Sequence, residues 1–395
     1  MRILTVANHL GARGGLERTQ LTNCRALAAR GHRVDLLYVS AGDFADEWRA
    51  FAGTMVQTPG TLPRRRRPLG SAAAVARAVA AGRRLRPDVL YVYRYWDLPY
   101  AAAVRGVAGV PVVYHLCLPP PVSVPGWLEL SLRRVDRTLS VSRDTAARWE
   151  ATGLGSARTE VVLTGIDLDR YVPADPRGRA AARAGLGLGA DDVLVLYAGR
   201  IGREKGVDVL VRAFAAVHGA EPAARLVVVG SPSLGADPAD SARYEAELRA
   251  SAGTLPVTFA PAQHDVVPLL QSADVAVVPS LWPEPLSRSL MEPLACGVPV
   301  VATDVGGNPE ILRGWLAPNL VPAGDPEALA ARVLAVARWR RDQPDLGRRC
   351  RDEAEARLSL RAETDAIEAA MAALGPLPQP RRWRQASASE ATSWG

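Results

Sequence analysis

Two glutamates, Glu284 and Glu292, stand eight residues apart in a segment that also holds Pro285. Proline is favoured at the first position of a helix, where its missing N–H costs nothing, so Pro285 predicts a helix start. Glu284 would lie at that start and Glu292 about two turns further in, roughly 12 Å along the axis. The free N–H groups of residues 286–289 would form an anion site. Carboxylates beside such a site indicate a sugar nucleotide, whose hydroxyls need acceptors and whose diphosphate needs N–H donors. A glutamate that only satisfies the helix dipole is the simpler alternative.

The chain contains a single lysine, Lys205, and its other basic side chains are all arginines. Residues 193–197 predict a strand and residues 207–217 predict an amphipathic helix, so Arg200 and Lys205 fall in the connection between them. Sites in open α/β sheets lie at the carboxyl ends of strands, where this connection begins. An ammonium group is a compact charge that fits a crowded phosphate site better than a planar guanidinium. The sequence therefore predicts a phosphate site here, although one lysine could also fall in this loop by chance.

Further candidates lie in the first half of the chain. Gly11, Gly14 and Gly15 follow an expected strand and would allow a ligand to approach the backbone closely, although an ordinary tight turn explains them equally well. They do not fit the G-x-G-x-x-G pattern of a dinucleotide site. His115 ends the expected strand 110–115, where a buried structural role is the simpler interpretation.

The segment 279–312 resembles the E-x7-E signature of the family 4 retaining glycosyltransferases, which have the GT-B fold. It matches the two acids, the strand GVPVVAT and the turn GGNPE. It departs from the family at Ser287, Arg288 and Pro293. Ser287 still offers its backbone N–H, and Arg288 adds a cation that could contact phosphate or an anionic acceptor. Pro293 removes a hydrogen bond inside the helix and should kink it.

Three other stretches resemble the same family. The spacing G-R-x5-G around Arg200 and Lys205 is similar to its donor diphosphate clamp. The loop at Gly14 and Gly15 is similar to its GG-x-E loop, and Thr164 replaces Asn in a stretch like N-G-V-D. The resemblance covers residues 1 to about 375 and is strongest in the second half.

The resemblance implies a retaining transferase that moves a hexose-type sugar from a UDP- or GDP-linked donor to a hydroxyl acceptor, with no metal or other cofactor. The catalytic residues that it implies are Glu284, Arg200, Lys205 and His115, the last beside the donor sugar. Arg200 and Lys205 would hold the departing diphosphate, Glu292 would accept from ribose hydroxyls, and Glu284 would accept from sugar hydroxyls. The acceptor would attack from the face of the leaving diphosphate, which takes its proton, and no side chain acts as nucleophile. The donor-binding residues that it implies are Gly14, Gly15, Gly199, Arg200, Lys205, Gly230, His264, Val266, Glu284, Leu286, Ser287, Arg288, Ser289 and Glu292.

A repeated strand–helix rhythm predicts an α/β protein with two Rossmann-like, doubly wound domains that face each other across a cleft. We expect an acceptor-binding domain over 1–170, a linker over 171–190 that runs into a short helix, and a nucleotide-sugar-binding domain over 191–357. A terminal helix over 358–375 would, by the resemblance, cross back to the first domain, and residues 376–395 should be disordered. The expected strands are 3–7, 34–39, 89–93, 110–115 and 137–141, then 193–197, 225–229, 257–259, 275–278 and 298–302.

Composition fits an intracellular enzyme. The chain has 395 residues, of which 48% are hydrophobic, and its four cysteines show no metal-binding spacing. We expect a cytoplasmic location, because no signal peptide or membrane-spanning run is visible. The net charge is +7. Arginine clusters indicate either solvated faces or contact with an anionic membrane surface, and no nucleic-acid motif accompanies them. The clusters are residues 64–67, 83–86, 133–134 and 381–384.

The acceptor is not disclosed by the sequence. Aromatic residues 91–96 and the proline-rich stretch 118–121 would line the acceptor side of the cleft, although aromatic runs are more often core. A glycan, a lipid-linked glycan and a small metabolite all remain open. Another GT-B enzyme, such as an epimerase or pseudo-glycosyl synthase, and a non-catalytic sugar-nucleotide binding protein are the alternative functions. A nicotinamide dehydrogenase is disfavoured by the missing fingerprint.

Overall fold

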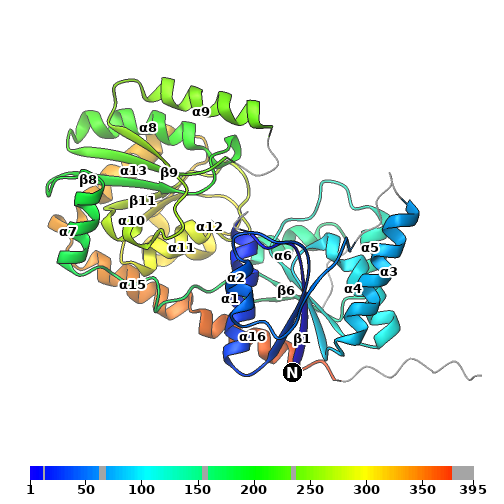
Figure 1. The fold of residues 1–395 in the computed structure, drawn as a ribbon. Coiled ribbons are helices and arrows are strands. Elements are labelled where there is room, and N and C mark those ends of the chain that lie inside the picture. Colours follow the sequence, from blue (N-terminus) through cyan, green and yellow to red (C-terminus); the bar gives the residue numbers. More distant parts are fainter. Residues whose placement is uncertain (12–13, 62–67, 154–158, 233–236, 376–395) are drawn as a thin grey trace, which may run out of the picture.

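The computed structural model describes residues 1–11, 14–61, 68–153, 159–232 and 237–375. These residues form two α/β bodies, each built on its own parallel sheet (Figure 1). The strand order is β3-β2-β1-β4-β5-β6-β7 in the first sheet and β10-β9-β8-β11-β12-β13 in the second. Because the order reverses direction beside the first strand of each sheet, both are doubly wound. The predicted fold class is confirmed.

The first sheet is covered by helices on both faces. Alternate residues of its strand β1 face opposite cores, Ile3 and Ala7 towards one and Leu4 and Val6 towards the other. Helices α1, α2 and α16 pack on one face and α3, α4 and α5 on the other. The strands are β1 (Arg2–His9), β2 (Arg33–Ser40), β3 (Met55–Gln57), β4 (Val89–Val92), β5 (Val112–Leu116), β6 (Arg137–Ser140) and β7 (Thr159–Val161). The helices are α1 (Gly15–Ala29), α2 (Ala45–Arg49), α3 (Pro68–Arg84), η1 (Tyr95–Asp97), α4 (Leu98–Ala108), α5 (Gly126–Leu132) and α6 (Arg143–Glu150).

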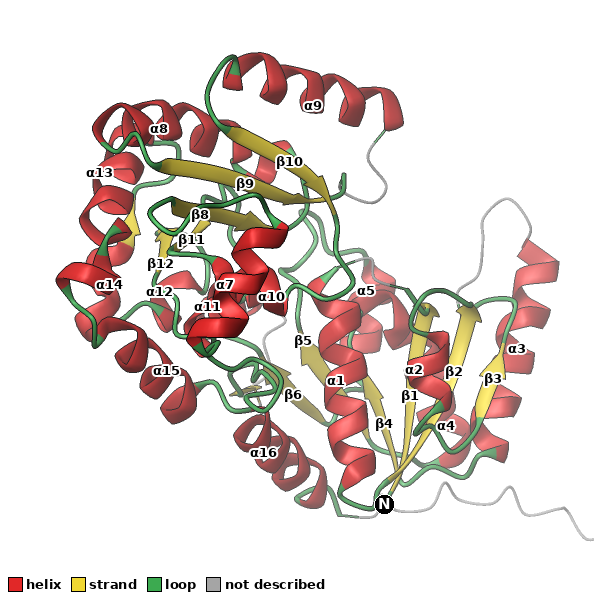
Figure 2. Ribbon diagram, turned by 60° about the vertical axis from the view of Figure 1, so that its left-hand side comes forward, coloured by secondary structure: helices red, strands yellow, loops and turns green. Residues whose placement is uncertain are grey.

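The second sheet has the same plan (Figure 2). In its central strand Val193 and Val195 face the helices α8, α9 and α13, whereas Leu194 and Leu196 face α10, α11 and α15. The strands are β8 (Val193–Ala198), β9 (Ala224–Gly230), β10 (Val257–Pro261), β11 (Val275–Val278), β12 (Val300–Thr303) and β13 (Leu320–Val321). The helices are α7 (Pro176–Gly185), η2 (Arg203–Lys205), α8 (Val207–Ala220), α9 (Pro238–Ala252), α10 (Val267–Ser272), α11 (Arg288–Ala295), α12 (Asn308–Ile311), η3 (Gly314–Asn319), α13 (Pro326–Ala337), α14 (Trp339–Asp342) and α15 (Leu346–Arg357).

Two chain segments connect the bodies and pair with each other. The Ile166 N–H donates to the Leu358 carbonyl over 2.8 Å, and the Leu360 N–H donates to the Ile166 carbonyl over 3.0 Å. The last helix, α16 (Leu360–Ala372), then packs against α1 in the first body (Figure 2). At this contact the Asn23 side-chain amide donates a hydrogen bond to the buried Glu363 carboxylate over 2.8 Å.

The short helix expected in the linker is present as α7, and it packs against the second body. In α7 the buried Arg183 reaches the Asp274 carboxylate at 3.1 Å, so this part of residues 171–190 belongs to the second body. The expected tail 376–395 and the arginine clusters 64–67 and 381–384 lie outside the described residues. Among the described helices, none combines the length and the apolar character that crossing a membrane requires.

Each of the ten expected strands is present, shifted by at most two residues at either end. Three further strands, β3, β7 and β13, were not predicted. They have two or three residues each, too few to show an apolar pattern. Helix α1 ends at Ala29, and Gly31 follows its C-cap Arg30 with a φ of 86°, the left-handed conformation that favours glycine at this position.

Candidate active site

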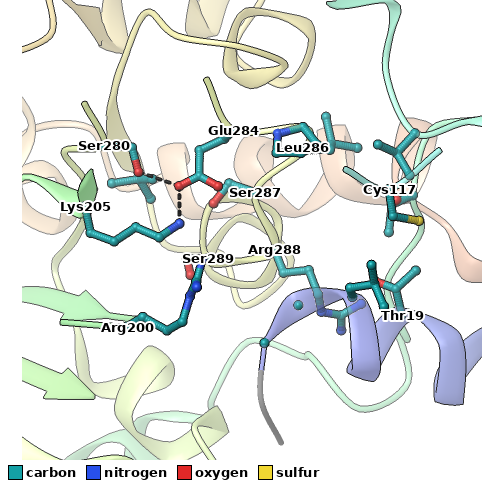
Figure 3. A pocket seen from close by; sticks show the side chains of 18 of the residues that line it. Thr19, Cys117, Arg200, Lys205, Ser280, Glu284, Leu286, Ser287, Arg288 and Ser289 are labelled. Atoms are coloured by element: carbon teal, nitrogen blue, oxygen red, sulfur yellow. Dashed lines mark hydrogen bonds and ion pairs between the residues drawn. The ribbon is translucent and has the colours of Figure 1, made fainter. Parts of the chain in front are cut away.

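A cavity of about 310 Å³ lies between the carboxyl ends of the two sheets. Its second-domain wall comes from the end of β8 with the loop after it, and from the segment between the end of β11 and the start of α11. Its first-domain wall comes from the start of α1 and from residues that follow β5, β6 and β7. Figure 3 shows Arg200, Lys205, Glu284 and Arg288 around it. The topology therefore brings together most of the residues that the sequence predicted.

The lone lysine and the first glutamate form an ion pair in this wall. Lys205 Nζ contacts Glu284 Oε1, and the Ser280 hydroxyl donates to the same oxygen over 2.5 Å (Figure 3). Only 9% of the Glu284 side chain and 13% of the Lys205 side chain are exposed. The partial burial strengthens the attraction, because the local dielectric is lower than that of water. A donor phosphate that enters would share the ammonium group with Glu284.

The Gly306–Gly307 turn fixes the backbone of Glu284. The Gly307 N–H donates to the Glu284 carbonyl over 2.7 Å. Gly306 has a φ of 56°, and a Cβ there would lie 2.1 Å from the same carbonyl oxygen. A Cβ on Gly307 would lie 2.3 Å from the Pro285 carbonyl oxygen. Only glycines allow this close approach, so the turn positions the glutamate.

The expected helix start at Pro285 is wrong. Helix α11 begins at Arg288, with Ser287 as its N-cap in an extended conformation. A helix that began at Pro285 would use the Glu284 carbonyl as its first acceptor, but Gly307 donates to that carbonyl instead. The N–H groups of Arg288 and Ser289 are left without an intrahelical acceptor in the first turn and lie at the cavity wall. The helix start, with its free N–H groups, thus lies three residues later than predicted, and anion binding there stays a prediction.

The second glutamate of the pair is turned away from the cavity. Arg288 Nε and the Tyr171 hydroxyl both donate to Glu292 Oε1, each over 3.0 Å. Glu292 does not line the cavity, whereas Arg288 does. Pro293 lies inside α11, which ends two residues later at Ala295. Binding of a ribose by Glu292 stays a prediction that requires this carboxylate to exchange partners.

Several predicted donor-binding residues lie at the cavity. Gly14 and Gly15 line it at the start of α1, and Leu286, Ser287 and Ser289 line it opposite. The Ser289 hydroxyl is used locally, because it donates to the Ala198 carbonyl over 2.9 Å. Their contacts with a donor stay predictions.

Arg200 brings a positive charge to the same wall, beside Gly199. Its backbone carbonyl accepts from the Tyr197 hydroxyl. Within the described ranges its guanidinium has no hydrogen-bond or ion-pair partner, so it is available to an anion.

Three other predicted residues do not line the cavity. Gly230 ends β9, and a Cβ there would lie 1.9 Å from the Gly199 carbonyl oxygen. The missing side chain of Gly230 therefore allows the loop after β8 to pack closely against β9. His264 and Val266 lie in the loop between β10 and α10, and Val266 packs against the core. Their donor-binding roles stay predictions.

His115 is at the end of β5, as expected, but its side chain points into the core. It is fully buried, its Nδ1 is 2.6 Å from the Tyr91 hydroxyl, and its ring lies near those of Tyr91 and Tyr93. Burial lowers the pKa of His115 to about 3, so the imidazole is neutral near neutral pH. The structure does not bring this side chain to the cavity; Cys117, two residues on, lines it instead.

Sequence reasoning did not single out Trp282, Ser280 or Thr19, which also line the cavity. The Trp282 ring lies 5.7 Å from Lys205 Nζ, a cation–π distance. Trp282 and Ser280 stand within four residues of Glu284, so proximity to that motif was an available signal. Thr19 lies one turn into α1, and only the tertiary arrangement places it here.

Comparison with known proteins agrees with this geometry. The family model described as Glycosyltransferase Family 4 matches residues 13–170, and that of Glycosyl transferases group 1 matches residues 178–357. The chain belongs to the family 4 glycosyltransferases. Each family model covers one of the two bodies of this glycosyltransferase, so the family predicted from the sequence is confirmed.

Solved structures share the fold of this family 4 glycosyltransferase. The Anabaena protein HepE, solved in complex with UDP, has a TM-score of 0.80 and 22% identity and covers 95% of this chain and 100% of its own. A Rickettsia africae glycosyltransferase has a TM-score of 0.76 and 17% identity and covers 93% of this chain and 97% of its own. The likeness shows that the fold is GT-B.

Sequence relatives are more similar over a shorter region. The D-inositol 3-phosphate glycosyltransferase of Mycobacterium tuberculosis is 38% identical over 208 residues. The match covers 51% of this chain and 41% of that protein, so the chain spans about two fifths of the curated relative.

Proposed function

We propose that this chain transfers a hexose-type sugar from a nucleotide diphosphate sugar to a hydroxyl acceptor. The observation that carries the proposal is the wall that places Lys205, Arg200 and the first N–H groups of α11 around one cavity with the Glu284 carboxylate. Cations and N–H donors suit a diphosphate, and the carboxylate suits sugar hydroxyls. A UDP-linked donor has the most support, because HepE was solved with UDP and with UDP-glucose.

The proposed reaction proceeds with retention and without a metal. The acceptor oxygen bonds to the anomeric carbon as the bond from that carbon to the phosphate oxygen breaks, on the same face. The acceptor proton passes to the departing phosphate oxygen, so no side chain need act as nucleophile. Lys205 and Arg200 stabilise the charge that develops on the diphosphate, the kind of contribution that is usually largest in catalysis. Glu284 accepts hydrogen bonds from the sugar and orients it.

The acceptor enters from the first domain. The cavity wall there is formed by apolar side chains such as Leu16, Leu118 and Val141, with hydroxyls from Thr19 and Thr164. Among the described residues no charged side chain of the first domain lines it. We therefore propose an acceptor that is uncharged next to its reacting hydroxyl: a glycan, a lipid-linked glycan or a small metabolite.

We further propose that the enzyme acts in the cytoplasm beside an anionic membrane surface, which α5 contacts. Trp127 and Leu130 are exposed on one stripe of this helix, and Leu130 is 68% exposed. Arg134 continues the stripe one turn later, and Arg133 is exposed beside it. A short helix with an aromatic and an aliphatic side chain next to arginines suits the interface of an anionic bilayer.

Vesicle flotation tests the membrane proposal. The protein should float with vesicles that contain phosphatidylglycerol, and less at high salt. A Trp127→Ser/Leu130→Ser variant should bind at least about tenfold more weakly, because burying each apolar side chain contributes roughly 1.5 kcal/mol or more. Val107→Ser is the matched control, since Val107 is also exposed but lies in the last turn of α4. Equal binding of wild type to neutral and anionic vesicles, or no binding to either, would refute the proposal.

A thermal-shift panel of UDP, GDP, ADP, dTDP and NAD tests the donor site. A ligand at a hundred times its dissociation constant stabilises the folded state by about 2.7 kcal/mol. We expect UDP to raise the melting temperature of the wild type and to have little effect on Lys205→Ala. A shift from NAD alone would contradict a sugar-nucleotide site. Once a donor is known, NMR of the product's anomeric configuration tests retention, and an isomerised donor would indicate an epimerase instead.

A further inference from the structure

A carboxylate from the second domain caps the first turn of α6, which belongs to the first domain. Its N-cap, Ser142, accepts from the Thr145 N–H over 3.1 Å. The two N–H groups that remain, those of Arg143 and Asp144, each donate over 2.9 Å to a different oxygen of the Glu310 carboxylate. A carboxylate at a helix N-terminus is stabilised by the helix dipole, and bidentate charged hydrogen bonds are strong and directional.

Glu310 belongs to the segment that fixes the catalytic glutamate. It lies in α12, which follows the Gly306–Gly307 turn directly. That turn donates to the Glu284 carbonyl, and Arg357 of α15 donates to the carbonyls of Glu310 and Ile311. Hydrogen bonds within the second domain therefore fix both ends of residues 306–311. The only carboxylate of this segment, that of Glu310, contacts the first domain.

Helix α6 begins next to the acceptor side of the cavity. Val141, which lines the cavity, is separated from the first residue of α6 only by the N-cap Ser142. A shift of α6 relative to Glu310 would therefore move this wall relative to Glu284. The crossing segments at Ile166 and Leu360 connect the domains elsewhere, so they constrain this spacing only indirectly.

We propose that Glu310 is a positioning residue that holds the acceptor wall of the first domain in register with Glu284. This inference rests on the proposed function for its catalytic consequence, but not for the contact itself. Glu310 touches neither donor nor acceptor and acts through the α6 backbone. Donor binding, which uses second-domain residues for the most part, should not depend on it.

Two variants and a control test the proposal. Glu310→Ala removes the carboxylate. Arg143→Pro removes one of the two N–H donors, and proline is compatible with the first position of a helix. Glu327→Ala is the control, because Glu327 also follows a proline at a helix start in the second domain but is exposed.

Glu310→Ala should lower kcat/KM at least about tenfold, as expected for loss of hydrogen bonds to a charged group, with the dissociation constant of UDP within about twofold of wild type. Amide exchange at Arg143 and Asp144 should quicken, and X-ray scattering should show a wider distribution of domain spacings. Arg143→Pro should cause part of the same loss, and the double variant should be no worse than Glu310→Ala.

Losses that multiply in the double variant would overturn the proposal, as would Glu310→Ala with activity within about twofold of wild type. An unchanged scattering profile together with a lower melting temperature would also overturn it, because Glu310 would then be structural only. If the wild type transfers no sugar, the exchange and scattering measurements still decide whether Glu310 links the domains, which separates failure of this inference from failure of the proposed function.

Discussion

Lys205→Ala should lower kcat by about 10²- to 10³-fold, the range seen when one preorganised donor to a developing charge is lost. The ammonium is the only lysine charge in the chain, and it lies in the cavity wall in contact with Glu284. In the proposed reaction, its removal would leave the departing diphosphate with Arg200, Arg288 and the α11 N–H groups. It also leaves the buried Glu284 carboxylate without a countercharge, which is unfavourable at a buried site. Steady-state kinetics with the donor that the thermal-shift panel identifies would measure the effect.

Two further substitutions test whether the effect is specific to the ammonium group at position 205. Lys205→Arg should recover little activity, because a planar guanidinium does not replace a compact ammonium between a carboxylate and a phosphate. Arg203→Ala is the control: Arg203 lies in the same turn, η2, but pairs with Glu247 at the surface and does not line the cavity. We expect Arg203→Ala to retain wild-type kinetics. Full activity of Lys205→Ala would remove this residue from the catalytic site.

Gly306→Ala should abolish most activity although residue 306 has no side chain to contact a substrate. The new Cβ would lie 2.1 Å from the Glu284 carbonyl oxygen and 2.6 Å from its nitrogen, so the glutamate backbone must move. A misplacement of about 1 Å can cost 10²-fold in rate, and we expect a loss of at least that size. The left-handed φ adds roughly 1–2 kcal/mol of strain. Kinetics and thermal unfolding of the same preparation would measure both effects.

Gly314→Ala separates strain from displacement. Gly314 has a φ of 57°, almost the value of Gly306, but a Cβ there would meet nothing within 4 Å. Gly314→Ala should therefore carry about the same strain as Gly306→Ala, which lowers the melting temperature, but it should leave kcat unchanged. If Gly306→Ala proved no more harmful to activity than Gly314→Ala, the turn would not be what positions Glu284.

Most strands could be predicted from the sequence, because a parallel strand that is buried on both faces is apolar along its whole length. Val193, Val195, Leu194 and Leu196 are divided between two cores, and such a run reads as a strand in the sequence alone. The position of Lys205 followed from the same logic, since a loop after a strand's carboxyl end faces the cleft in this fold class. Short edge strands such as β13 carry no such pattern and were missed.

By itself the sequence determined the two-domain α/β fold, the family and the loop that carries Lys205, because these depend on local apolar patterns and motif spacing. Only the tertiary structure decided where α11 starts, since the Glu284 carbonyl accepts from Gly307, far along the chain. It decided between a buried and a catalytic role for His115, and it alone brought the Glu310 carboxylate to the start of α6. Each of these outcomes depends on which distant backbone or side-chain group comes within hydrogen-bonding distance, and residue spacing along one segment carries no information about that.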